Sequence, residues 1–169
     1  FSSFIFSFVA FAFFFIYTGD METRNIFFNI SPLDHRYSLS EAAVFESLSE
    51  YISEQAAVIS CAKAEIALIK AHLSIRNELT PERERELDQV IARIEPAEVY
   101  KEEEKTKHNI RALVNVMKTK VSADVAPLVH LGATSVDILD TALSVRLRDC
   151  VQQVILPLLK ELELHLCTI

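Results

Sequence analysis

The sequence predicts an all-α protein, and three observations lead to that prediction. Apolar residues recur at steps of three and four along most of the chain after position 40, which is the period of a helix with one buried face. No segment shows the strict alternation of a half-buried strand. Only Gly19 and Gly132 are glycines in 169 residues, where average usage of about 7% would give roughly twelve. So few glycines cannot supply a set of tight hairpins between strands.

The first helical region follows Ser38, which stands three residues before Glu41 at the spacing of a capping box. The helical spacing is interrupted once, at Gln55, so we expect one helix or two stacked end to end, closing before Asn77. The residues that carry the spacing are Val44, Phe45, Leu48, Tyr51, Ile52, Val58, Ile59, Ala62, Ile66, Ile69 and Leu73.

Two helices are expected next, each opened by a proline. Thr80 and Pro81 combine a capping hydroxyl with proline at the first helical position, and this helix should run through Ile94. Pro96 opens a second, single helix, with Glu103 and Lys107 paired at i, i+4 on its exposed face. Its buried stripe is supplied by Val99, Ile110, Leu113, Val114 and Met117.

The last helix is predicted from Thr134 to about Leu166, after a loop at residues 121–133 that contains Pro127 and Gly132. A kink is expected at Pro157. Some thirty residues is long beside an average helix of about 11–12, and its apolar residues cover more than one narrow stripe. We therefore expect one rod of a bundle that several partner helices cover.

Residues 1–20 differ in composition from the rest. Eight of the eleven phenylalanines lie in the first fifteen positions, and no charged residue precedes Asp20. An apolar run of this length suits a membrane anchor or a signal peptide, although no basic residue precedes it. We expect a leader or an artefact of translation ahead of Met21, with an anchor or a folded part of the domain as alternatives.

Charge and cysteine content exclude several classes of function. The chain has 24 acidic and 17 basic residues and a formal charge of −7, which argues against nucleic-acid binding. Without a glycine-rich loop it has no dinucleotide or P-loop motif. Cys61, Cys150 and Cys167 lack metal-ligand or redox spacing, so we expect reduced thiols in a cytosolic protein and no metal site.

Two polar stretches precede the long helix. In SPLDHRYS (residues 31–38), Arg36 offers a planar fork to a phosphate or carboxylate and Tyr37 adds a hydroxyl; a plain surface turn is the alternative. In EKTKHNIRALV (residues 104–114), Lys107, His108 and Arg111 can donate to an anion, although His108 could also form an ordinary i, i+4 pair with Glu104.

The third stretch, VHLGATSVDILDTA (residues 129–142), is the most informative. Thr134 and Ser135 are natural capping residues at the start of a helix, and Asp137 stands close to the capping-box position. Free N–H groups and hydroxyls at a helix start bind anions, and His130 adds a donor. A well-made cap would explain the hydroxyls, but it leaves the clustered His130 and Gly132 unexplained.

These three stretches, in this order, resemble the amino-terminal part of adenylosuccinate lyases, in the fumarase/aspartase superfamily. SPLDHRYS is similar to the family's opening Arg-Tyr element, KTKHNIRALV to its T-x-H-D-V-x-A segment, and HLGATSVDILDTA to its H-x-G-x-T-S-x-D-I-x-D-T-A segment. The resemblance covers about residues 30–165. One departure is Asn109, where the family usually has aspartate, so a carboxylate that orients His108 is lost.

The resemblance implies an all-α lyase that releases fumarate by β-elimination from adenylosuccinate, giving AMP, and from the succinyl-carboxamide intermediate of purine synthesis. It implies no metal or organic cofactor, a cytoplasmic homotetramer with shared active sites, and no membrane partner. The expected division is an apolar extension at 1–20, an amino-terminal helical lyase domain at 21–131, and the start of a central helical bundle at 132–169.

The resemblance also implies roles for the polar residues. Arg36 and Tyr37 would hold the nucleotide phosphate end, and Thr134 and Ser135 would bind a succinyl carboxylate with His130 close by. The second segment would contribute further substrate contacts, from Lys107, His108 and Asn109.

The family's catalytic acid, a histidine after the third motif, and its catalytic base, a serine on a later loop, have no counterpart before Ile169. We therefore expect a fragment that carries part of the binding surface and no catalytic residue. Two alternatives remain. One is a carboxymuconate cycloisomerase or another fumarate-releasing lyase of the superfamily. The other is a non-catalytic helical interaction protein, tethered to a membrane by residues 4–17.

Overall fold

The computed structural model describes residues 25–31, 38 and 40–168, and within them it contains helices and no strand. Residues 1–20 and the predicted phosphate-binding pair Arg36 and Tyr37 lie outside the described residues. The helices are α3 (Ala42–Ile52), α4 (Glu54–Ile75), α5 (Pro81–Ile91), α6 (Pro96–Thr106), α7 (Asn109–Lys120), α8 (Ser135–Cys150) and α9 (Leu156–Cys167). Short helical turns are η1 (Ile26–Phe28), η2 (Ala126–Leu128) and the π-helical η3 (Val151–Ile155).

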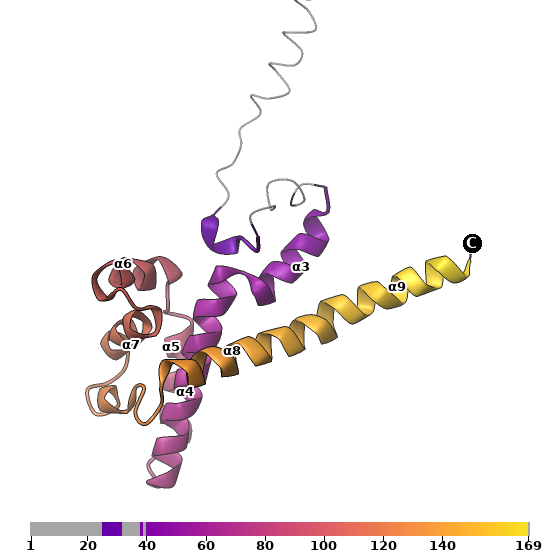
Figure 1. Cartoon of the computed structure of the whole chain (residues 1–169). Helices are drawn as coiled ribbons and strands as arrows, with labels where there is room; N and C mark the ends of the chain where they lie inside the picture. Colours follow the sequence, from indigo (N-terminus) through magenta and orange to yellow (C-terminus); the bar gives the residue numbers. More distant parts are fainter. Residues whose placement is uncertain (1–24, 32–37, 39, 169) are drawn as a thin grey trace, which may run out of the picture.

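Helix α4 is the centre of the domain. It packs against α8 and also contacts α3, α5, α6 and α7 (Figure 1). Its side chains Ala62, Ile66, Ile69 and Leu73 are almost fully buried, as their helical spacing predicts. They form one core with residues of α5, α7 and α8. The all-α prediction is confirmed.

The first helical region is divided at Ser53, so of the two expected arrangements the structure has two successive helices, with the break two residues before the predicted interruption at Gln55. The Ser53 hydroxyl accepts a hydrogen bond from the Ala56 N–H at 3.2 Å and caps α4. The predicted capping box at Ser38 and Glu41 is wrong. Because α3 begins only at Ala42, Glu41 occupies the residue before the helix and cannot act as the acid in its first turn.

Helix α5 begins as predicted. The Thr80 hydroxyl accepts from the Arg83 N–H at 3.3 Å, and Pro81 is the first helical residue. The helix is joined to α4 by Lys70, whose ammonium group lies 2.9 Å from Asp88 and 3.2 Å from Glu84. These ion pairs therefore link α5 to α4, against which it packs.

The single helix predicted after Pro96 is wrong, because the structure divides it into α6 and α7. Lys107 has a left-handed backbone with φ +53°, which ends α6, and His108 then precedes the first residue of α7. Among the described residues Glu103 and Lys107 form no ion pair; Lys107 is the residue that ends α6, and its N–H donates to the Glu103 carbonyl at 2.8 Å. The chain reverses here, and α6 and α7 pack together as a hairpin.

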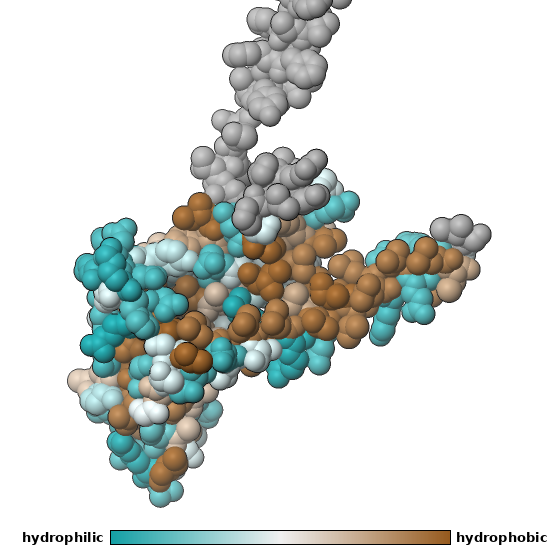
Figure 2. Space-filling model, viewed as in Figure 1, coloured by the Kyte–Doolittle hydropathy of each residue, from teal (hydrophilic) through white to brown (hydrophobic). Residues whose placement is uncertain are grey.

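Helices α8 and α9 form one long rod through η3, as predicted, and it extends beyond the other helices (Figure 1). The irregularity lies one turn before Pro157: the Leu156 N–H donates to the Val151 carbonyl, five residues earlier, in a π-helical turn. No residue of α9 is buried. Its apolar residues make an exposed surface along the rod (Figure 2), and they include Leu158, Leu159, Leu162, Leu164 and Leu166.

Within the part of the chain that the structure describes, no helix combines the length and the apolar character needed to cross a membrane. Cys61 and Cys150 are buried, Cys167 is exposed, and each is a free thiol. Burial raises the pKa of the Cys61 and Cys150 thiols, so both are protonated at neutral pH.

Candidate functional site

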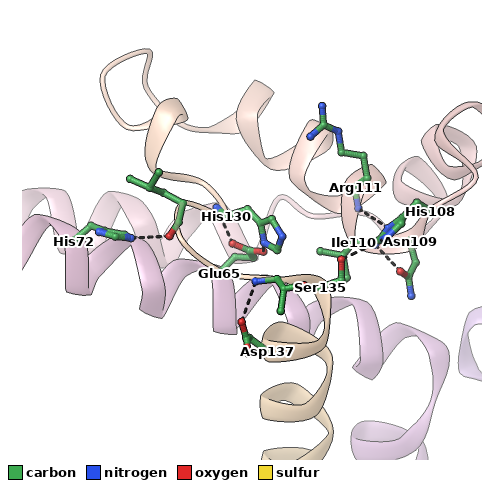
Figure 3. Close-up of polar contacts among 11 residues, drawn as sticks. Glu65, His72, His108, Asn109, Ile110, Arg111, His130, Ser135 and Asp137 are labelled. Atoms are coloured by element: carbon green, nitrogen blue, oxygen red, sulfur yellow. Dashed lines mark hydrogen bonds and ion pairs between the residues drawn. The ribbon is translucent and has the colours of Figure 1, made fainter.

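The candidate site lies where the first turns of α7 and α8 meet. His108 precedes α7 and Ser135 is the first residue of α8, and the His108 Nε2 atom lies 3.4 Å from the Ser135 hydroxyl oxygen (Figure 3). The two residues are 27 positions apart in the sequence. The fold therefore brings the second and third polar stretches together, as their proposed common role requires.

His108 also caps α7, and this contact sets its tautomer. Its Nδ1 atom accepts a hydrogen bond from the Arg111 N–H at 3.2 Å. An accepting Nδ1 carries no proton, so the neutral ring carries its proton on Nε2, the atom that faces Ser135. The Ser135 oxygen is then the acceptor of that contact, and its own O–H is left to donate to a ligand.

The turn before α7 is fixed by Thr106. Its hydroxyl accepts from the His108 N–H at 3.3 Å and donates to the His108 carbonyl at 3.0 Å. Next to this turn, the side-chain oxygen of Asn109 accepts from the Ile110 N–H at 2.7 Å. Lys107 and Arg111, one residue before and three residues after His108, are both exposed.

The start of α8 is capped by its own carboxylate. Asp137 accepts from the Thr134 N–H at 2.9 Å, which is the acidic half of the predicted capping box. A carboxylate near a helix N-terminus is favoured by the helix dipole. The Asp137 N–H donates to the Thr134 carbonyl at 3.1 Å, so the N–H groups of Ser135 and Val136 are those that a first turn leaves open to a ligand, and here Thr134 is exposed and Ser135 half-buried beside them. This helix start can therefore bind an anion.

His130 reaches the same region on the loop before α8, and a buried acid holds it. Its backbone is left-handed, with φ +64°. Glu65 of α4 accepts from the His130 N–H at 3.0 Å, and its second oxygen lies 2.7 Å from His130 Nδ1. Glu65 has no exposed surface. Burial raises the pKa of the Glu65 carboxyl, and the hydrogen bonds from His130 oppose that rise.

Two further features fix this loop. His72 of α4 donates through Nε2 to the Leu131 carbonyl at 2.9 Å. Gly132 has φ +77°, and nothing lies within 4 Å of the position that a Cβ would take. The glycine is therefore needed for its backbone conformation and not to make room for a protein neighbour.

Sequence reasoning missed Glu65 and His72. Glu65 could have been noticed, because it lies one helical turn from both Cys61 and Ile69, on a face that is otherwise apolar. His72 carries no such signal, since it is a polar residue at a half-buried position.

The predicted substrate-binding residues can now be placed. His108 contacts Ser135 at the start of α8, where Thr134 precedes the helix; His130 lies on the loop four residues before Thr134 and is held by Glu65, and Lys107 and Asn109 flank His108 in the sequence. Among the described residues, no group of three or more His, Cys, Asp or Glu side chains could hold a metal ion. The donors at this surface are hydroxyls, imidazoles, cations and backbone N–H groups, which suit a carboxylate or a phosphate.

Comparison with known proteins gives two curated relatives. The chain is 33% identical over 120 residues to an adenylosuccinate lyase of Archaeoglobus fulgidus, covering 71% of this chain and 25% of the relative. It is 31% identical over 125 residues to an adenylosuccinate lyase of Methanothermobacter thermautotrophicus, covering 72% of this chain and 26% of the relative. The chain thus spans about a quarter of the length of each relative. No family model matches the chain, and no solved structure matches it.

Proposed function

The chain is a relative of adenylosuccinate lyases, and from this we propose that it forms part of the substrate-binding surface of such an enzyme. The reaction would be β-elimination of fumarate from adenylosuccinate, giving AMP, and from the succinyl-carboxamide intermediate of purine synthesis, in the cytoplasm. The contact of His108 with Ser135 carries the proposal most directly, because it unites two polar segments that are distant in sequence.

The donors at the start of α8 fit the succinyl group of such a substrate. A carboxylate placed there would accept from the Ser135 O–H, which the His108 tautomer leaves to donate, and from N–H groups of the first turn. Thr134 would add its hydroxyl, and Lys107 a positive charge. His130 and Asn109 would complete the contacts from the described residues, while the assignment of Arg36 and Tyr37 to the phosphate stays a prediction.

We also propose that proton transfer depends on groups that this chain does not supply. The described side chains at the start of α8 bind and orient, and neither the acid nor the base motif of the family occurs in residues 1–169. General acid–base groups typically contribute about 10²–10⁴-fold each. We therefore expect the 169-residue chain to release no fumarate from adenylosuccinate above background, and measurable turnover would contradict this assignment.

The exposed rod supports a proposal about assembly. Leucines along α9 are 36–68% exposed, and a helix with such a surface needs other helices to cover it. We propose that copies of the protein cover it as a homotetramer whose subunits share active sites. Light scattering should show self-association of the chain, and Leu159→Glu with Leu162→Glu should reduce it. A monomeric parent chain would contradict the proposal.

Binding of adenylosuccinate to the chain tests the site. Isothermal titration calorimetry should show binding by the parent and roughly ten- to hundredfold weaker binding by Ser135→Ala, since a hydrogen bond to a charged group contributes about 1.5–3 kcal/mol. Ser144→Ala is the matched control, because Ser144 is an exposed serine further along the same helix. Absence of binding by the parent, or equal loss in both variants, would contradict the proposed function.

A further inference from the structure

The contact between α4 and the loop before α8 is more than a packing contact. Both carboxylate oxygens of Glu65 are engaged by one residue: Oε2 by the His130 backbone N–H at 3.0 Å and Oε1 by the His130 ring at 2.7 Å (Figure 3). Glu65 and His130 are 65 positions apart in the sequence, so the pair is created by the fold. A buried carboxylate without partners would be costly, and these two bonds satisfy it.

The pair determines which ring nitrogen of His130 holds a proton. A carboxylate only accepts hydrogen bonds, so the Nδ1 atom at 2.7 Å must be the donor. In the neutral ring, Nε2 then carries the lone pair, and this edge of the ring is turned away from Glu65. When Nε2 takes up a proton, the ring becomes a cation that can donate to an anion, and the Glu65 carboxylate compensates its charge.

The backbone of His130 is held by the same residue. A residue with a Cβ at φ +64° is strained, and such strain persists only where surrounding contacts fix it. The bond from the His130 N–H to Glu65 is one such contact, and the bond from His72 to the adjacent Leu131 carbonyl is another. The imidazole is 23% exposed, so part of the ring reaches the surface on the loop that leads into α8.

We propose that Glu65 is a positioning residue for the anion site: it fixes the backbone and the Nδ1–H tautomer of His130, so that Nε2 is the ring atom presented at the start of α8. The further step, that Nε2 meets a carboxylate of adenylosuccinate, rests on the proposed function. Glu65 itself, buried behind the ring, touches no substrate.

Histidine-selective ¹⁵N NMR on the 169-residue chain tests the tautomer directly. The spectrum is recorded at a pH where His130 is neutral, and the His130 signals are identified by their loss in His130→Gln. We expect a protonated Nδ1 and an unprotonated Nε2. The reverse assignment would overturn the proposal, and this measurement needs no variant of Glu65.

Glu65→Gln should reverse the tautomer. The amide oxygen of the variant can still accept from the His130 N–H, but its NH₂ group then donates to Nδ1, which moves the ring proton to Nε2. A merely structural role for Glu65 would leave the ring tautomer unchanged. Glu86→Gln, an exposed acid on α5, is the matched control and should leave both His130 signals in place.

Calorimetry then separates the two proposals. With adenylosuccinate as the probe, Glu65→Gln should weaken binding about tenfold, because the glutamine NH₂ group facing Nδ1 opposes formation of the imidazolium and leaves a neutral Nε2–H in place of a charged donor. If the tautomer reverses as expected but the parent chain does not bind adenylosuccinate, the positioning role stands and the proposed function fails. If the parent binds and Glu65→Gln leaves the tautomer unchanged, the positioning role of Glu65 is overturned.

Discussion

Replacing Lys107 by glycine should stabilise the chain, although it removes a proposed substrate contact. Lys107 joins α6 to α7 with φ +53°, a conformation that costs a residue with a Cβ roughly 1–2 kcal/mol. Glycine removes this cost, but its greater conformational freedom in the unfolded chain lowers the gain in stability by roughly 0.5–1 kcal/mol. The net gain in the free energy of unfolding for Lys107→Gly should be about 0.5–1 kcal/mol. In the proposed site Lys107 contributes a positive charge, which glycine would remove.

Urea denaturation followed by circular dichroism measures this gain. With a slope of about 1–3 kcal/mol per molar urea, Lys107→Gly should raise the midpoint by roughly 0.2–1 M. Lys107→Ala is the control, because it removes the same charge and keeps the Cβ, so its midpoint should not rise. Both variants should bind adenylosuccinate more weakly than the parent. Equal midpoints for the two variants would refute the strain, and unchanged affinity would refute the role of the charge.

Three further changes have expected outcomes. Asp137→Ala removes the acceptor of the Thr134 N–H and should lower the free energy of unfolding by about 1 kcal/mol in urea titrations. Asp140→Ala, at an exposed acid one turn further along α8, should leave the free energy of unfolding nearly unchanged, and an equal loss in both variants would argue against the cap. Ile69→Ala, at a fully buried position of α4, should lower the free energy of unfolding by about 2–5 kcal/mol. Ile75 is 81% exposed on the same helix, so Ile75→Ala should lower it by less than about 0.5 kcal/mol, and similar losses in the two variants would contradict the assigned core. The raised pKa of Glu65 means that the folded chain binds the Glu65 proton more tightly than the unfolded chain does. The parent should therefore lose stability relative to Glu65→Gln as pH rises from about 4.5 through the folded pKa. If the denaturation midpoint of the parent instead rises relative to that of Glu65→Gln over this range, the pKa of Glu65 is not raised by folding.

The fold was predictable where local chemistry sets it. Thr80 with Pro81 and Thr134 with Asp137 mark helix starts, because a capping oxygen and the helix dipole act within one turn. The break at Lys107 has a signal in the sequence that the prediction of one helix did not use: residues 101–109, KEEEKTKHN, contain no apolar residue, so the helical spacing is interrupted there. What the spacing does not give is the reversal of the chain, in which α6 packs against α7 and His108 caps α7 with its side chain.

The candidate site was predictable in its residue types and not in its geometry. Hydroxyls at a helix start and nearby histidines indicate an anion site from sequence alone. That His108 would touch Ser135, and that Glu65 would hold His130, depends on contacts between elements 27 and 65 residues apart, which spacing does not encode. The segment with Arg36 and Tyr37 lies outside the described residues, so its place beside this site stays a prediction.

The central claim is that adenylosuccinate binds at the start of α8, and mapping by NMR tests it most directly. Amide shifts of the ¹⁵N-labelled chain are followed as adenylosuccinate is added. We predict saturable changes at His108, His130 and Ser135. Changes confined to the hollow between α5 and the end of α7, which Arg83 and Arg93 line, would contradict the claim.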